Sequence, residues 1–211
     1  MNRTVLSALK SMAVLVCIAV VCVGVLALCN KFFPKYVPVL DGDTAAIINS
    51  VCPTGESDDD AFSDGYLVML YEDDYGATLA DFNKQNKSSK AQILFVYGEV
   101  KGDSAGAFIV ECSSTGRDGD VVILTAYRDS VIVGGAVKKQ NESYFSNLPS
   151  DLFGAVVGKS DDVDLVGTIG KTGATISLTA IERAINLSND FAAEYGSAIS
   201  GVISKKGAAN E

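Results

Sequence analysis

The sequence reads Val121-Val122-Ile123-Leu124-Thr125-Ala126-Tyr127, then Arg128-Asp129-Ser130, then Val131-Ile132-Val133-Gly134-Gly135-Ala136-Val137, and this stretch decides the predicted fold. Both runs are rich in β-branched residues, and the polar segment between them is typical of a hairpin turn. Two further β-rich runs precede it, 93–97, which Gly98 is expected to end, and 107–112. Successive strands with short connections indicate an antiparallel sheet.

Helical patterns surround these strands. We expect short helices at 41–52, 78–86 and 148–157, and an additional strand at 65–71. The last helix begins near Ile176 and has its apolar stripe at Leu178, Ile181, Ile185, Ser188, Ala192 and Tyr195. Its cap is either a Thr179–Glu182 capping box or Ser177. The tail after Lys205 is expected to fray. The predicted fold class is α+β, an antiparallel sheet backed by helices, with one N-terminal transmembrane helix.

The N-terminal segment is apolar. Residues 11–30 carry no charge, which is about the length of 20 residues that a helix needs to cross a bilayer. A retained single-span anchor at 11–31 is therefore predicted, with a cytoplasmic N-terminus and an extracytoplasmic C-terminal domain. Two alternatives remain open, a signal peptide cleaved after small residues such as Val25 and Ala27, and a lipoprotein site at Cys29.

The acidic residues are confined to the part of the chain that follows the predicted anchor. All 26 acidic residues follow position 40, where 13 of the 17 Lys and Arg residues also lie, so the exported part has a net charge near −13. Such a charge argues against nucleic acid as a partner. The predicted organisation is a cytoplasmic N-terminus (1–10), the anchor (11–31), a membrane-proximal segment (32–90), a ligand-binding domain (91–198) and a C-terminal tail (199–211).

Histidine is absent, which excludes Ser-His-Asp and Cys-His hydrolases and histidine-based zinc sites. Three of the five cysteines lie in the apolar segment. The other two, Cys52 and Cys112, have no metal-like spacing, and whether they form a disulfide is left open. The sequence predicts no metal site.

Small residues precede the last helix, in the segment Gly170-Lys171-Thr172-Gly173-Ala174-Thr175-Ile176-Ser177. The N–H groups and the positive dipole end of a helix N-terminus favour a phosphate. Gly173 lets the backbone bend, and Thr175 offers a hydroxyl at the start of the helix. On these grounds alone the segment is either a phosphate site or an ordinary turn.

Thr172-Gly173-Ala174-Thr175, followed by Ile176-Ser177 and an apolar helix, resembles the Ser/Thr-Gly-Ala-Thr flavinylation motif of the FMN-binding domain family. That family includes the G subunit of Rnf complexes and the related FMN-carrying subunit of the Na⁺-translocating NADH:quinone reductase. The resemblance implies that Thr175 carries FMN as a phosphoester attached by a flavin transferase. It also implies that Thr172, Gly173, Ala174 and Ser177 surround the attachment point.

The resemblance extends upstream. Residues 113–124 are similar to the family's Gly-rich turn and strand, and 131–138 to its return strand. Glu142 and Ser143 stand where the family has a Glu-Thr pair beside the flavin. Three features differ from the family pattern: Ile169 replaces an Asp, Lys171 replaces a small residue, and 144–147 replace a Pro-Gly-Leu-Gly stretch.

The function implied by this resemblance is electron transfer in an Rnf-type ion-translocating ferredoxin:NAD⁺ oxidoreductase, within which the chain is a flavoprotein subunit and not an enzyme alone. Its expected partners are the integral membrane subunits of that complex. Two alternatives are a stand-alone surface FMN carrier that delivers electrons to external acceptors, and a surface-anchored binding domain without a cofactor.

Overall fold

The computed structural model describes residues 40, 42–52, 65–101, 104–170 and 173–208, with a few separate positions between 12 and 23. The chain divides into two units, Met1–Pro38 and Val39–Glu211, and the second contains the fold described below. Within the described residues, no helix has both the length and the apolarity needed to cross a membrane. Most of the predicted anchor at 11–31 lies outside the described residues.

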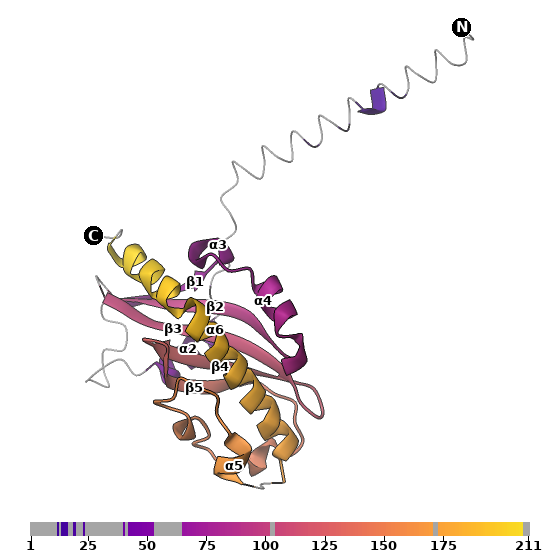
Figure 1. The fold of residues 1–211 in the computed structure, drawn as a ribbon, viewed down its shortest axis with the longest axis vertical. Coiled ribbons are helices and arrows are strands. Elements are labelled where there is room, and N and C mark those ends of the chain that lie inside the picture. The colour runs from indigo at the N-terminus through magenta and orange to yellow at the C-terminus, as the bar shows by residue number, and fades with distance from the viewer. Residues whose placement is uncertain are drawn as a thin grey trace. The chain divides into compact units, whose positions relative to one another are not determined.

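The second unit is built on one antiparallel sheet (Figure 1), as the sequence predicts. Its five strands lie side by side in chain order. They are β1 (Gly65–Leu70), β2 (Ala91–Lys101), β3 (Ser104–Thr115), β4 (Asp120–Arg128) and β5 (Val131–Lys139). Since β1 pairs with β2, the predicted membrane-proximal segment contributes to the same sheet as the predicted ligand-binding domain.

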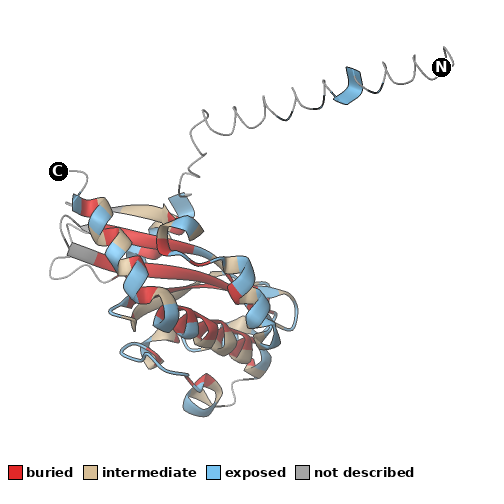
Figure 2. Cartoon of the chain, turned by 45° about the horizontal axis from the view of Figure 1, so that its top comes forward, coloured by how far each residue is buried: buried red, intermediate tan, exposed pale blue. Residues whose placement is uncertain are grey.

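Helices cover both faces of this sheet. The long α6 (Thr175–Ala208) crosses one face and packs on β2, β3 and β4, whereas α2 (Gly42–Val51) packs on β4 and β5. Buried residues follow the strands and the inner side of α6 (Figure 2). The other α-helices of the described residues 65–170 are short: α3 (Glu72–Tyr75), α4 (Leu79–Gln85) and α5 (Leu165–Ile169). Of these only α4 was predicted.

The predicted hairpin is confirmed. Val131 pairs with Arg128, and the two residues between them have φ angles of 52° (Asp129) and 60° (Ser130). Positive φ at both central positions suits the right-handed twist of the flanking strands. On the α6 side, the rings of Tyr127 and Phe108 stack with centroids 5.2 Å apart, and the Tyr127 hydroxyl donates to Asn189 Oδ1 at 2.8 Å. The hairpin is thereby joined to α6.

Two predicted elements are corrected. Gly98 does not end its strand, because β2 continues to Lys101. Residues 148–157 are not a helix and contain only the short 3₁₀ turn Phe153–Ala155. Pro149 has no N–H to donate, and Gly154 N donates to Asp151 Oδ1 at 3.1 Å, a local bond that competes with helix formation.

The chain end and the cysteines also have defined positions. Residues 199–208, expected as a tail, form the last turns of α6. Cys112 lies in the core cluster under α6, and Cys52 lies in the cluster under α2. The two are not joined by a disulfide, because they are on opposite faces of the sheet.

Candidate functional site

The start of α6 positions the predicted attachment residue. Thr175 is the first helical residue, and the first hydrogen bond of the helix runs from Leu178 N to Ala174 O at 2.9 Å. In a helix, the N–H groups before that bond have no acceptor within the helix. Those of Thr175, Ile176 and Ser177 therefore point out of its end. Thr175 is partly buried and Ala174 is buried.

Gly173 sets the direction in which the chain enters this helix. Its φ is +79°, a conformation that glycine adopts without steric cost. A Cβ placed there would lie 3.3 Å from Asn147 Nδ2. The turn at Gly173 therefore lies against the 145–147 segment. Lys171 and Thr172 are outside the described residues.

Glu142 joins two of the predicted segments. Its side chain is buried, and Ser177 Oγ donates to its Oε2 at 2.6 Å. Its Oε1 accepts from Asp118 N at 2.8 Å. The structure thus brings Glu142 and Ser177 into direct contact, although 35 positions separate them. A carboxylate beside the first turn of a helix is also favoured by the helix dipole.

The β3–β4 turn forms the other side of Glu142. Gly116 N donates to Gly119 O at 2.8 Å. A Cβ on Gly116 would overlap the carboxylate of Glu142 and crowd Gly119 O, which favours glycine at this position. Ser143 N donates to Asp118 Oδ2 at 3.0 Å. This bond, together with the nearby Arg117 guanidinium, lowers the pKa of the Asp118 carboxyl. Ser143 is exposed, and its side chain also contributes to the lowered pKa of Asp118.

Aromatic side chains stand next to these groups. The Arg117 guanidinium carbon lies 5.4 Å from the centre of the Tyr144 ring, a cation–π distance. A cavity of about 390 Å³ is lined by Phe145, Leu148, Phe153 and Val137 among others. Asn147, whose Nδ2 lies near Gly173, is adjacent in sequence to the lining residues Ser146 and Leu148.

The capping box predicted at Thr179 and Glu182 is wrong. The Thr179 hydroxyl donates back to Thr175 O at 2.8 Å, so Thr179 lies inside the helix. Glu182 Oε2 accepts from Leu165 N and Val166 N, at 2.8 and 3.1 Å, and so holds the start of α5. Ser177 is not the N-cap either, because α6 begins two residues earlier.

Ile169 ends α5 and packs partly buried against the core cluster under α6. Its side chain therefore has a packing role. The sequence did not single out Asp118, Gly116 or Asn147 as site residues. The resemblance included Gly116 and Asp118 only as part of the Gly-rich turn and strand at 113–124, and a turn pattern says nothing about which distant carboxylate the turn holds.

Among the described residues, no group of three or more Cys, Asp or Glu side chains is arranged to hold a metal ion. Comparison with protein-family models, with curated proteins and with solved structures finds no match to this chain.

Proposed function

We propose that this chain is a membrane-anchored, extracytoplasmic electron-transfer flavoprotein that carries FMN as a phosphoester on Thr175. One observation carries the proposal: the Ser177–Glu142 hydrogen bond joins the two segments that the family resemblance associates with the flavin. Thr175 lies two positions from Ser177, at the open end of the same helix. The site is therefore assembled from residues 142 and 173–177.

The start of α6 fits a phosphate group. The N–H groups of the first turn, together with the helix dipole, stabilise an anion there. The Glu142 carboxylate is bound by the Ser177 hydroxyl and the Asp118 N–H, so these two bonds leave the first-turn N–H groups available. Gly173 lets the backbone approach the phosphate closely.

The cavity lined by residues of 135–137 and 145–153 fits an aromatic ring system by its size and lining. Its volume of about 390 Å³ is within the range of small-molecule sites, and its phenylalanine and leucine side chains are the apolar type that lines them. When bound, FMN supplies one- and two-electron redox chemistry. The start of α6 would hold the phosphate, and the apolar side chains of the cavity would contact the ring.

The attachment residue is tested by co-expression with a flavin transferase, followed by a denaturing gel viewed under ultraviolet light and intact mass measurement. The wild-type chain should give a fluorescent band with the mass of one added FMN, and Thr175→Ala should give neither. Thr179→Ala is the matched control, because its hydroxyl lies one turn further and bonds to Thr175 O. A fluorescent Thr175→Ala band, or an unlabelled wild type, would refute the proposal.

The assignment to an Rnf-type complex is a separate part of the proposal and rests on the family resemblance. It predicts that the anchored chain co-purifies with integral membrane subunits after mild detergent extraction. Recovery of the flavinylated chain by itself would contradict this part and leave the Thr175 assignment standing.

A further inference from the structure

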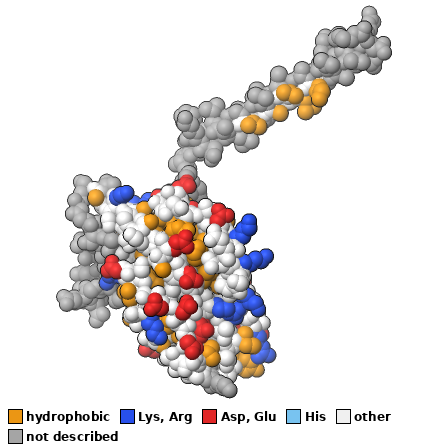
Figure 3. Space-filling model, in the orientation of Figure 1, with side chains coloured by type: hydrophobic (Ala, Val, Ile, Leu, Met, Phe, Trp, Pro, Cys, Tyr) orange, Lys and Arg blue, Asp and Glu red, His pale blue; other side chains and the backbone are white. Residues whose placement is uncertain are grey.

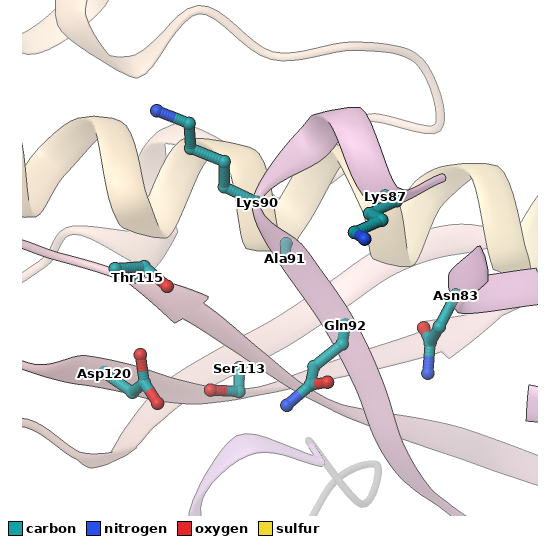
Figure 4. Close-up of a pocket in the computed structure, with 8 residues that line it drawn as sticks. All are labelled: Asn83, Lys87, Lys90, Ala91, Gln92, Ser113, Thr115 and Asp120. Carbon is teal, nitrogen blue, oxygen red and sulfur yellow. The ribbon is translucent and has the colours of Figure 1, made fainter. Parts of the chain in front are cut away.

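A second, polar cavity of about 350 Å³ lies at the turn end of the β3–β4 hairpin (Figure 4). It is on the sheet face opposite α6. Side chains alternate along a strand, so Ser113 and Thr115 share the face of Ile109, which belongs to the core cluster under α2. The cavity is therefore separate from the start of α6.

The floor of this cavity consists of two cross-strand pairs. Gln92 is opposite Ser113, and Thr115 is opposite Asp120. Ser113 is 5% exposed, and it lines the cavity. Its hydroxyl is not among the described buried polar atoms that lack a partner, and a ligand in the cavity can reach it and form a hydrogen bond with it. In Figure 4 it lies among the side chains of Gln92 and Asp120.

The rim of the cavity is cationic. Lys87 and Lys90 line it, both are exposed, and the Lys90 side chain in Figure 4 extends away from the floor. The Lys90 backbone is fixed, because Thr115 N donates to Lys90 O at 3.2 Å. Figure 3 shows Lys and Arg side chains gathered along the edge that α4 occupies in Figure 1. This edge contrasts with the acidic composition of the domain as a whole.

We propose that this cavity binds a small polyol phosphate. Two lysine ammonium groups at the rim attract a phosphate as point charges. The hydroxyls of Ser113 and Thr115 and the amide of Gln92 both donate and accept, and the Asp120 carboxylate accepts from a ligand hydroxyl. Inorganic phosphate alone would be repelled by Asp120, and an uncharged polyol would not use the lysines. A ligand with one anionic end and one hydroxylated end can bind the lysines through the first and Asp120 through the second.

The test is calorimetric titration of the full-length chain in detergent with sorbitol 6-phosphate. We expect saturable binding, and at least tenfold weaker binding of sorbitol and of inorganic phosphate. A tenfold loss corresponds to about 1.4 kcal/mol. The Lys87→Gln, Lys90→Gln double variant and the Ser113→Ala variant should each lose at least that factor. Lys84→Gln should bind normally, because Lys84 belongs to the same basic segment and does not line the cavity.

Several outcomes would overturn the proposal. These are no saturable binding, unchanged affinity in the double lysine variant or in Ser113→Ala, inorganic phosphate binding as tightly as the polyol phosphate, and glycine binding more tightly, which would indicate a zwitterion site. The site does not depend on flavinylation, so Thr175→Ala should bind sorbitol 6-phosphate as the wild type does. Failure of one proposal therefore leaves the other intact.

Discussion

The Ser177 hydroxyl donates a 2.6 Å hydrogen bond to the buried carboxylate of Glu142. This bond connects the first turn of α6 to the segment that follows β5. The Asp118 N–H, in the β3–β4 turn, donates to the other oxygen of the same carboxylate. Three segments distant in sequence are thus held by one side chain.

A double-mutant cycle should measure this bond. Glu142→Ala and Ser177→Ala should each destabilise the chain, and their coupling energy should be about 2 kcal/mol, the range of hydrogen bonds to charged groups. The single Ser177→Ala change leaves Glu142 Oε2 buried without that donor. The measurement is urea unfolding of all four proteins. Strictly additive effects would show that the two side chains do not stabilise each other.

Gly173 is predicted to affect both the stability of the chain, through its positive φ, and flavin attachment, through its place before Thr175. Gly173→Ala places a Cβ at φ +79° and should cost about 1 kcal/mol of folding free energy. Gly158→Ala is the matched control, because Gly158 has φ +84° and nothing within 4 Å of an added Cβ. Urea unfolding should show a similar loss in both variants, whereas the yield of covalent flavin should fall only for Gly173→Ala. An equal fall in both variants would assign the effect to general instability.

Asp118 should give the chain an acid-dependent stability. Its folded pKa is lowered by the Ser143 bonds and by Arg117, so its ionised form is favoured by folding. The stabilisation is therefore fully present above the ordinary Asp pKa of about 3.9 and is lost as the pH falls through the lowered folded value. Comparing wild type with Asp118→Asn by urea unfolding between neutral pH and pH 3, we expect the difference to shrink on acidification. A difference independent of pH would show that the charge contributes nothing.

Local chemistry explains which parts of the fold were predictable. The β4–β5 hairpin follows from β-branched runs around Asp129 and Ser130, and every residue that decides it lies within the hairpin. The role of Glu182 was not predictable, because its partners Leu165 and Val166 belong to a five-residue helix with no clear periodic pattern. At the site, the resemblance named Glu142 and Ser177 separately. Their hydrogen bond depends on how the sheet places residue 142 against α6.

The position of Gly98 inside β2 also depends on a contact with a residue distant in sequence. Glycine weakens a strand by its flexibility, which favours a strand end when only neighbours in sequence are considered. In the fold, a Cβ on Gly98 would lie 2.8 Å from Cγ1 of Ile203, which α6 presses against the sheet more than 100 positions later. Glycine is therefore suited to this position inside β2, because a side chain there would overlap Ile203 of α6.

Gly98→Ala should consequently destabilise the chain by about 1–3 kcal/mol, the usual cost of overpacking a core. Ile203→Ala should also destabilise it, by leaving a cavity. Combining the two should restore part of the loss, because the new methyl group occupies space that the isoleucine vacates. The free energy of urea unfolding checks this: the double variant should be more stable than the sum of the single effects predicts. If the effects simply add, the close approach of α6 to β2 at Gly98 does not limit the residue at that position.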